Sequence, residues 1–207
     1  MLNSKLSREF FSRPTLEVAV ELLGKVLIFD NGDEQLGGRL VEVEAYIGED
    51  DPACHAFRGK TPRNAIMYGP AGYLYVYFTY GNHYMLNLVT ENEGFPAAVL
   101  LRGLEPLYGI EKMRQNRGID KLTEIANGPG KLAKALGITT VQKGLDITGD
   151  TFYLYDDKSS VGEIWRSPRI GLNDGKNKLW RFFIGNNPHV SKGQTYVKIR
   201  AEYFGEL

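Results

Sequence analysis

The stretch VEVEAYIGEDDPACH, residues 41–55, decides how the rest of the chain is interpreted. In its first half, apolar residues alternate with Glu42, Glu44 and Tyr46, and a period of two predicts a β-strand. Alternate side chains of a strand share a face, so Glu44 and Tyr46 should project to the same side, with Glu42 beside them. A carboxylate next to an aromatic ring is compatible with a small active site. From this stretch alone, a half-exposed strand with a solvated polar face is the favoured interpretation.

The composition is that of a globular protein of 207 residues, which fits one domain, or at most two small ones, with a substantial core. The 24 glycines and 9 prolines are scattered, which predicts many turns and short strands. No apolar run approaches the roughly 18 residues that cross a membrane, and the N-terminus lacks the apolar segment of a secretory signal. The single cysteine, Cys54, excludes an internal disulfide and argues against a zinc site. We therefore expect a cytoplasmic, reduced, metal-free protein.

The formal net charge is zero, with 25 Lys and Arg residues against 25 Asp and Glu residues. This balance weighs against a general nucleic-acid binder that is held by bulk charge. The distribution of charge matters more than its total. Acidic residues gather at 49–51, whereas residues 58–63 and 112–121 lean basic. A neutral chain can therefore still present a basic face.

Hydrophobic periodicity and turn residues divide the chain into helices, hairpins and short strands. The expected elements are a helix at 14–24, a hairpin from 25 to about 47 with Asn31-Gly32 at its turn, a long loop at 53–71, a hairpin at 73–90 with Gly81-Asn82 at its turn, a strand at 97–104, helices at 106–116 and 127–137, and strands at 151–155, 164–172, 180–184 and 196–201. Together they predict one α+β domain, a curved and mostly antiparallel β-sheet with helices packed around it.

Three of these elements place residues that could carry chemistry. The loop at 53–71 is long, and long loops in compact domains are usually functional or disordered. Tyr80 lies at the tip of the second hairpin, where a large ring has little of its own protein to pack against. Arg102 lies near the end of an apolar strand, and a buried arginine there needs a partner.

The two later helices carry further expectations. The helix at 106–116 should turn Leu107 inward. The glycine-rich entry to the helix at 127–137 leaves backbone N–H groups that can hold a phosphate, helped by Lys131 and Lys134. A plain glycine-rich helix start explains that second pattern equally well.

The candidate site combines one carboxylate, one guanidinium and several rings. Its members are Glu44, Arg102, Tyr46, His55, Tyr77 and Tyr80. There is no second carboxylate at an obvious spacing, no Ser-His-Asp order, no phosphate loop and no zinc signature. A single glutamate that activates water can hydrolyse a bond whose leaving group is already good, such as the N-glycosidic bond to a damaged base. Flat rings suit a flat base, which must first be extruded from duplex DNA, and a ring at a hairpin tip could fill the hole.

Eight motifs follow one another along nearly the whole chain, from about residue 7 to residue 191. They are EVEAY at 42–46, His55 nine residues after Tyr46, TPRN at 61–64, YVYFTYG at 75–81, LLRGLEPL at 100–107, GPGKL at 128–132, RIG at 169–171 and RFF at 181–183. In this order they resemble the alkyladenine (3-methyladenine) DNA glycosylase family. The region 146–178 matches more loosely, and we assign no site to it.

The resemblance implies a role for each matching residue. Glu44 falls on the general base for the water that attacks C1′ of the deoxyribose. Arg102 falls on the arginine that helps to hold that water and the nearby backbone. Tyr46 and His55 match the groups that line one side of the extruded base, and Tyr77 matches the ring on the other side.

Four more residues belong to the expected DNA interface. By the same resemblance, Tyr80 is the residue intercalated into the duplex, and Asn87 guards against the exocyclic amino group of guanine. Arg63 and Lys131 are charged loop residues that we expect to contact phosphates.

The resemblance therefore implies a monofunctional DNA glycosylase of base excision repair. Its partner would be double-stranded DNA that carries an alkylated or deaminated purine, it would need no cofactor, and we expect a monomer in the bacterial cytosol or nucleoid. The matched site contains no lysine, so neither a Schiff base nor strand cleavage is expected. Two alternatives remain open: a non-enzymatic lesion binder with the same pocket, and a hydrolase of free nucleosides.

Overall fold

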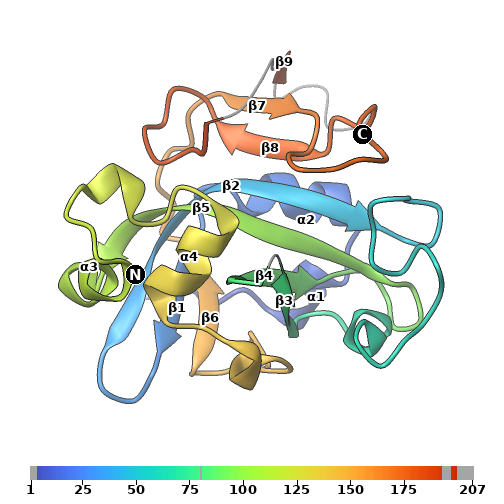
Figure 1. Ribbon diagram of the computed structural model, residues 1–207, viewed down its shortest axis with the longest axis horizontal. Coiled ribbons are helices and arrows are strands. Elements are labelled where there is room, and N and C mark those ends of the chain that lie inside the picture. Colours follow the sequence, from blue (N-terminus) through green and yellow to red (C-terminus); the bar gives the residue numbers. More distant parts are fainter. Residues whose placement is uncertain (1–3, 80, 193–196, 200–207) are drawn as a thin grey trace.

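The computed structural model describes residues 4–79, 81–192 and 197–199 of the chain. Its nine described strands join in one sheet, and four described α-helices pack around it (Figure 1). The strands are β1 (Val26–Asp30), β2 (Gln35–Ile47), β3 (Leu74–Thr79), β4 (His83–Val89), β5 (Ala97–Tyr108), β6 (Phe152–Tyr155), β7 (Ile164–Ser167), β8 (Arg181–Ile184) and β9 (Val197–Ile199). The helices are α1 (Arg8–Phe11), α2 (Thr15–Leu22), α3 (Ile110–Arg117) and α4 (Pro129–Leu136).

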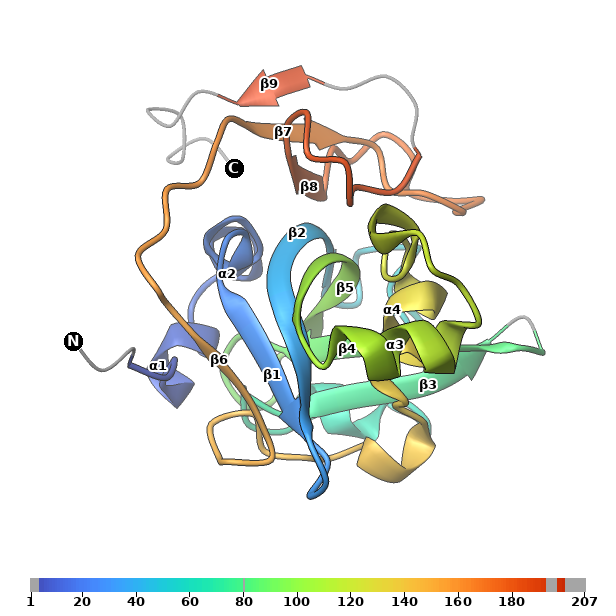
Figure 2. The same ribbon diagram turned by 90° about the vertical axis from the view of Figure 1, so that its left-hand side faces the viewer.

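Strand β2 organises the sheet. One of its edges pairs with β5 along most of its length, while the other pairs first with β1 and then, at residues 42–44, with β8. The strand order is β3-β4-β5-β2-β8-β7-β9, with β1 and β6 branching off beside β2, and the named pairs are antiparallel. The sheet curls, and both views place β7, β8 and β9 together at one end of the molecule (Figures 1 and 2). The predicted α+β fold with a curved antiparallel sheet is confirmed.

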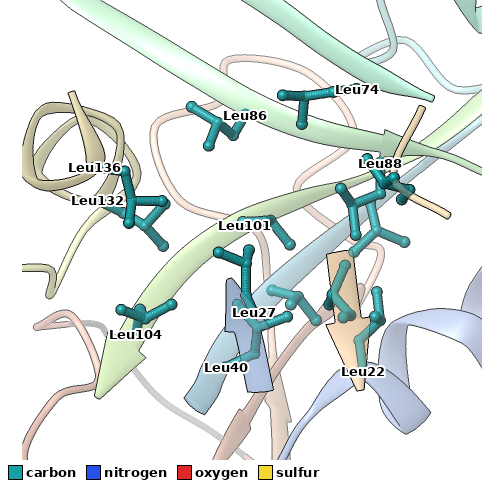
Figure 3. Packing of buried hydrophobic residues seen from close by; sticks show 14 of the residues in the cluster. Leu22, Leu27, Leu40, Leu74, Leu86, Leu88, Leu101, Leu104, Leu132 and Leu136 are labelled. Atoms are coloured by element: carbon teal, nitrogen blue, oxygen red, sulfur yellow. The ribbon is translucent and has the colours of Figure 1, made fainter. Parts of the chain in front are cut away.

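Both faces of β2 are buried around the candidate site, because residues 40–45 are all inaccessible to solvent. The apolar residues among them join the main core with α2 and α4, and Figure 3 shows a part of that core. The polar face is covered by β8 and by the segments on either side of it. The prediction that the polar face of β2 is exposed to solvent is therefore wrong. Periodicity within one strand does not show which distant segments of the chain pack over it.

Strand β5 is longer than predicted and includes Pro106, where the sequence predicted the start of a helix. Pro106 lies opposite Gly38 of β2 at a shift in the strand register, a place where a strand tolerates a residue without an N–H group. A Cβ atom on Gly38 would lie 2.0 Å from a carbonyl oxygen of β5, so the two backbones approach too closely for any other residue. Helix α3 begins only at Ile110, and Leu107 is 41% exposed rather than turned inward.

The remaining elements lie close to their predicted places. The first hairpin has a four-residue connection, 31–34, instead of a two-residue turn, because Asp30 pairs with Gln35. The loop at 53–71 contains turns and one short 3-10 helix, Ala65–Tyr68. The strand predicted at 164–172 ends at Ser167. Within the described ranges, we find no helix that is both long and apolar enough to cross a membrane.

Candidate active site

The carboxylate of Glu44 is fully buried and is held by three neighbours. Tyr46 donates its hydroxyl hydrogen to Oε2 at 2.8 Å, and the backbone N–H of Ile170 donates to Oε1 at 2.8 Å. Nη1 of Arg102 lies 3.2 Å from Oε1. Burial, together with the charge of Glu44, raises the pKa of Tyr46 well above its usual value, so the phenol stays protonated and acts as a donor. A carboxylate has about four acceptor sites, so these three contacts leave one on Oε2.

A β-bulge aims Arg102 at this carboxylate. The register of β2 with β5 steps from the pair Glu42–Gly103 to the pair Val43–Leu101 and passes over Arg102. An extra residue of this kind re-aims a side chain and is common next to active sites. Nε of Arg102 donates to Oε1 of Glu42 at 2.8 Å. Burial works to lower the pKa of Arg102, but the charges of the two glutamates raise it overall, so the buried arginine has the partners that its position requires.

Glu42 is a second buried carboxylate, two residues before Glu44 on the same strand. Its Oε1 accepts hydrogen bonds from Nε of Arg102 and of Arg181, both at 2.8 Å, and from Oγ of Ser191 at 2.7 Å. Its Oε2 accepts the backbone N–H of Ser191 at 2.6 Å. Burial works to raise the pKa of Glu42, but the two arginines lower it overall. Glu42 is therefore ionised at neutral pH.

A buried ion pair between Arg169 and Asp51 fixes the backbone next to Glu44. The two side chains are fully buried and form a bidentate pair, with N–O distances of 2.6 and 2.7 Å. The guanidinium also lies over the rings of Tyr46 and Trp180, 4.6 and 5.2 Å from their centroids. Because the N–H that reaches Glu44 belongs to the next residue in the chain, this pair positions that donor. We had assigned no site to this region, although RIG at 169–171 was among the matching motifs.

A small pocket opens beside the carboxylates, with about 260 Å³ of space that is partly open to solvent. Its lining residues are Tyr46, Ala53, His55, Met67, Tyr75, Tyr77, Asn87 and Ala98. The ring of Tyr46 belongs to the pocket, and its hydroxyl belongs to the carboxylate network. The two parts of the site therefore meet at this one side chain.

The rings in the pocket touch one another. His55 and Tyr77 lie edge to face, with centroids 4.4 Å apart, and Nδ1 of His55 is 2.8 Å from the hydroxyl of Tyr75. Two rings that stack on opposite faces of a base lie roughly 7 Å apart, twice the carbon–carbon contact distance of about 3.5 Å. A base can therefore enter between His55 and Tyr77 only if these two rings separate.

Comparisons with known proteins identify the family of the chain. A family model described as "Methylpurine-DNA glycosylase (MPG)" matches residues 9–188. The chain belongs to the methylpurine-DNA glycosylase family. It is 48% identical over 189 residues to a protein of Chlorobaculum parvum, an alignment that covers 90% of each chain. It is 44% identical to a protein of Chlorobium phaeobacteroides (90% of this chain, 95% of the other) and 48% identical to one of Methanocella arvoryzae (90% and 96%).

Each of these three relatives bears the name "Putative 3-methyladenine DNA glycosylase". Membership of the methylpurine-DNA glycosylase family makes the chain a DNA glycosylase, a hydrolase of DNA repair, and confirms the resemblance that its motifs indicated. In the part of the chain that the structure describes, no group of three or more His, Cys, Asp or Glu side chains is placed to hold a metal ion.

The other residues predicted for this methylpurine-DNA glycosylase lie around the pocket or away from it. Asn87 is buried on β4 and donates from Nδ2 to the carbonyl oxygen of Tyr75 at 3.1 Å. The guanidinium of Arg63 lies 5.3 Å from the centroid of the Tyr77 ring, at the pocket wall. Lys131 is on α4, where Nζ donates to the side chain of Asn127 at 2.7 Å. The prediction for Tyr80 falls outside the described residues.

Proposed function

We propose that this methylpurine-DNA glycosylase is monofunctional, and that it hydrolyses the N-glycosidic bond of alkylated or deaminated purines that it extrudes from duplex DNA. The position of Glu44 carries the proposal. Its carboxylate is buried, lies next to Arg102 and accepts a hydrogen bond from Tyr46, whose ring lines the aromatic pocket. A base held in this pocket would have its sugar next to the carboxylate.

In this mechanism Glu44 holds and deprotonates the attacking water. The acceptor site that remains on Oε2 supplies a place for that water. The oxygen of the water attacks C1′ on the side opposite the base, and its proton passes to Glu44. The electron pair of the C1′–N bond leaves with the base, which gives a free base and an abasic sugar with inverted configuration. A general base of this kind contributes about 10²- to 10⁴-fold to a rate.

The aromatic end of the site supplies selectivity. An alkylated purine is often cationic and leaves as a neutral base, and the electron-rich faces of Tyr46 and Tyr77 favour a cationic ring. Stacking on such rings contributes about 1–3 kcal/mol per base. Damaged bases are also easier to extrude, because their pairing and stacking are weaker. Asn87, held at the pocket wall by its bond to Tyr75, would meet the exocyclic amino group of an undamaged guanine.

Three residues are proposed as contacts to the DNA itself. Tyr80 is proposed, from its position in the sequence, to fill the gap that the extruded base leaves. Arg63 and Lys131 are proposed to contact phosphates. A salt series tests these contacts, because the affinity for duplex DNA falls steeply with salt when phosphates are bound.

The proposed lack of strand cleavage rests on the groups around Glu44. A Schiff base requires an amine, and the described side chains that contact this carboxylate belong to Tyr46 and Arg102. Lys143 lies near the pocket: its Nζ donates to the carbonyl oxygen of Arg63 at 2.9 Å and is 5.6 Å from the ring centroid of Tyr75. Lys143→Ala is therefore the variant with which to examine any strand cleavage that is observed.

The test is an assay of base release. The protein is incubated with methylated duplex DNA, with duplexes that carry one hypoxanthine or one ethenoadenine, and with free methylated nucleosides. We expect free base and alkali-sensitive abasic sites from at least one duplex, without direct strand breaks and without hydrolysis of the nucleosides. Tight lesion binding without release would support the non-enzymatic binder, and release from nucleosides alone would support the nucleoside hydrolase.

A further inference from the structure

Glu42 and Glu44 are two residues apart on the same strand and both are fully buried, but their surroundings differ. We propose that Glu42 is a positioning residue, which takes up the charge of Arg181 and part of the charge of Arg102 so that Glu44 does not face two unpaired buried arginines when it activates water. This inference rests on the proposed function of Glu44. It assigns a role to a carboxylate that touches neither the base nor the water.

The first observation is that Glu42 accepts more hydrogen bonds than Glu44 and accepts two of them from arginines. Four hydrogen bonds reach its two oxygens, from Arg102, from Arg181 and twice from Ser191. Three of these bonds reach Oε1 and one reaches Oε2. Glu44 accepts hydrogen bonds from Tyr46 and Ile170 and has one contact with Arg102. The structure thus separates a carboxylate that is bound to two arginines from one that contacts a single arginine.

The second observation is that one arginine is divided between the two carboxylates. Nε of Arg102 is 2.8 Å from Glu42, whereas its Nη1 is 3.2 Å from Glu44. Arg181 lies opposite Glu44 in the pairing of β2 with β8, but its Nε is directed to Glu42, also at 2.8 Å. Glu42 therefore has the closer contact with both cations. A carboxylate paired closely with two arginines is a weaker base than one paired with part of a single arginine.

The third observation is the balance of charge around Glu44. The charged and titratable groups that face it from the packed elements are Glu42, Tyr46, Arg102, Arg169 with its partner Asp51, and Arg181. The charge of Arg169 is neutralised by Asp51 in a bidentate pair. The two positive charges of Arg102 and Arg181 are neutralised by the two negative charges of Glu42 and Glu44. Removal of the charge of Glu42 leaves two buried cations to Glu44 alone. The proton affinity of Glu44 should then fall.

The experiment measures single-turnover release of methylpurines from methylated duplex DNA as a function of pH. For Glu42→Gln we expect a rate at neutral pH at least tenfold below wild type, and an acid limb of the pH–rate profile that moves to lower pH. Glu42→Asp keeps the charge, so its acid limb should stay near that of wild type whatever its rate. Arg181→Gln removes a positive charge and should move the acid limb to higher pH.

The acid limb should move to lower pH in Glu42→Gln and to higher pH in Arg181→Gln, and these opposite shifts distinguish the proposed role from a merely structural one. A loss of packing lowers stability and rate in both variants, but it does not move the acid limb according to the sign of the charge removed. If Glu42→Gln does not fold, the inference is still tested by whether the acid limb of Arg181→Gln moves to higher pH. Acid limbs that coincide with wild type in each folded variant would overturn the inference. Glu44→Gln is assayed in parallel: if it releases base at the wild-type rate, the proposed function fails as well, whereas if it is inactive while the limbs coincide, only the role of Glu42 is lost.

Discussion

The carboxylate end and the aromatic end of the site are built differently. At the carboxylate end, Glu42 and Glu44 are fully buried, and each is held by several described hydrogen bonds and ionic contacts. At the aromatic end, the rings of His55, Tyr75 and Tyr77 lie in a pocket that is partly open to solvent, and they touch where a base would have to enter. If a base binds in this pocket as proposed, the carboxylate end is already assembled in the free protein, whereas the aromatic end has to rearrange.

The difference teaches how the two tasks of such an enzyme can be divided. Groups that stabilise developing charge act best when they are fixed in advance and shielded from water. A pocket that accepts damaged purines of several shapes gains from side chains that can move apart. We therefore expect substitutions at the carboxylate end to change stability and the chemical step, and substitutions at the aromatic end to change lesion affinity.

The largest effect on stability is expected from Arg169→Met. It leaves Asp51 buried without its ionic partner, and breaking a buried pair in this way costs about 3–5 kcal/mol of the free energy of unfolding. The matched control is Arg39→Met, which breaks the pair with Asp157, whose side chains are 19% and 22% exposed, and should cost about 1 kcal/mol or less. Denaturant unfolding measures both, and equal losses would contradict the difference between a buried and a partly exposed pair.

An intermediate effect is expected from Tyr77→Ala at the aromatic end. Loss of one stacking ring should weaken binding of a lesion duplex by about 1–3 kcal/mol, roughly 5- to 150-fold in Kd. The single-turnover rate at saturating enzyme should fall less than tenfold. Tyr153→Ala on β6, which removes a ring that packs outside the pocket against Lys5, is the control and should leave both quantities unchanged. An unchanged Kd together with a large loss of rate would place Tyr77 in the chemical step instead.

The smallest expected effect is the change in the free energy of unfolding with pH that His55 causes. Desolvation by the neighbouring rings and the charge of Arg63 lower the pKa of His55 from 6.5 to about 4, so the ring is neutral in the folded protein above about pH 5. The unfolded chain binds this proton near pH 6.5, so the free energy of unfolding should fall as the pH drops from about 6.5 to about 4.

An NMR titration of the three histidines, assigned with His55→Gln, measures this value. The midpoint of His55 should lie well below 6.5 and should rise in Arg63→Gln. A wild-type midpoint near 6.5 would mean that the rings are solvated and apart, and that the aromatic end is already open.

The sequence predicted those contacts within the candidate site that are local. Glu44 and Tyr46 share a strand, and alternation placed them on one side of it, where they form a hydrogen bond. The need of Arg102 for a partner followed from its position in an apolar strand. The fold class followed from the hairpins and turn residues, and β5 was misjudged only at its end, where Pro106 fits the strand at a shift in its register.

The sequence did not locate the parts of the site that come from distant residues. Ile170 reaches Glu44 across 126 positions, and Ser191 reaches Glu42 across 149. No periodicity connects positions so far apart, and Glu42 looked like a solvated neighbour because its cover lies in β8 and the segment after it. The contact between His55 and Tyr77 depends on how a long loop packs on β3, which local patterns do not determine either.

Glu44→Gln on one lesion duplex tests the division between the two ends most directly. Two quantities are measured with the same samples: the single-turnover rate of base release and the Kd for the lesion duplex. If Glu44 activates the water while the aromatic end binds the base, the rate falls by about 10²-fold or more and the Kd stays within about threefold of wild type. Release of base at the wild-type rate, or a loss of affinity that accounts for the whole loss of activity, would contradict this division of tasks between the two ends.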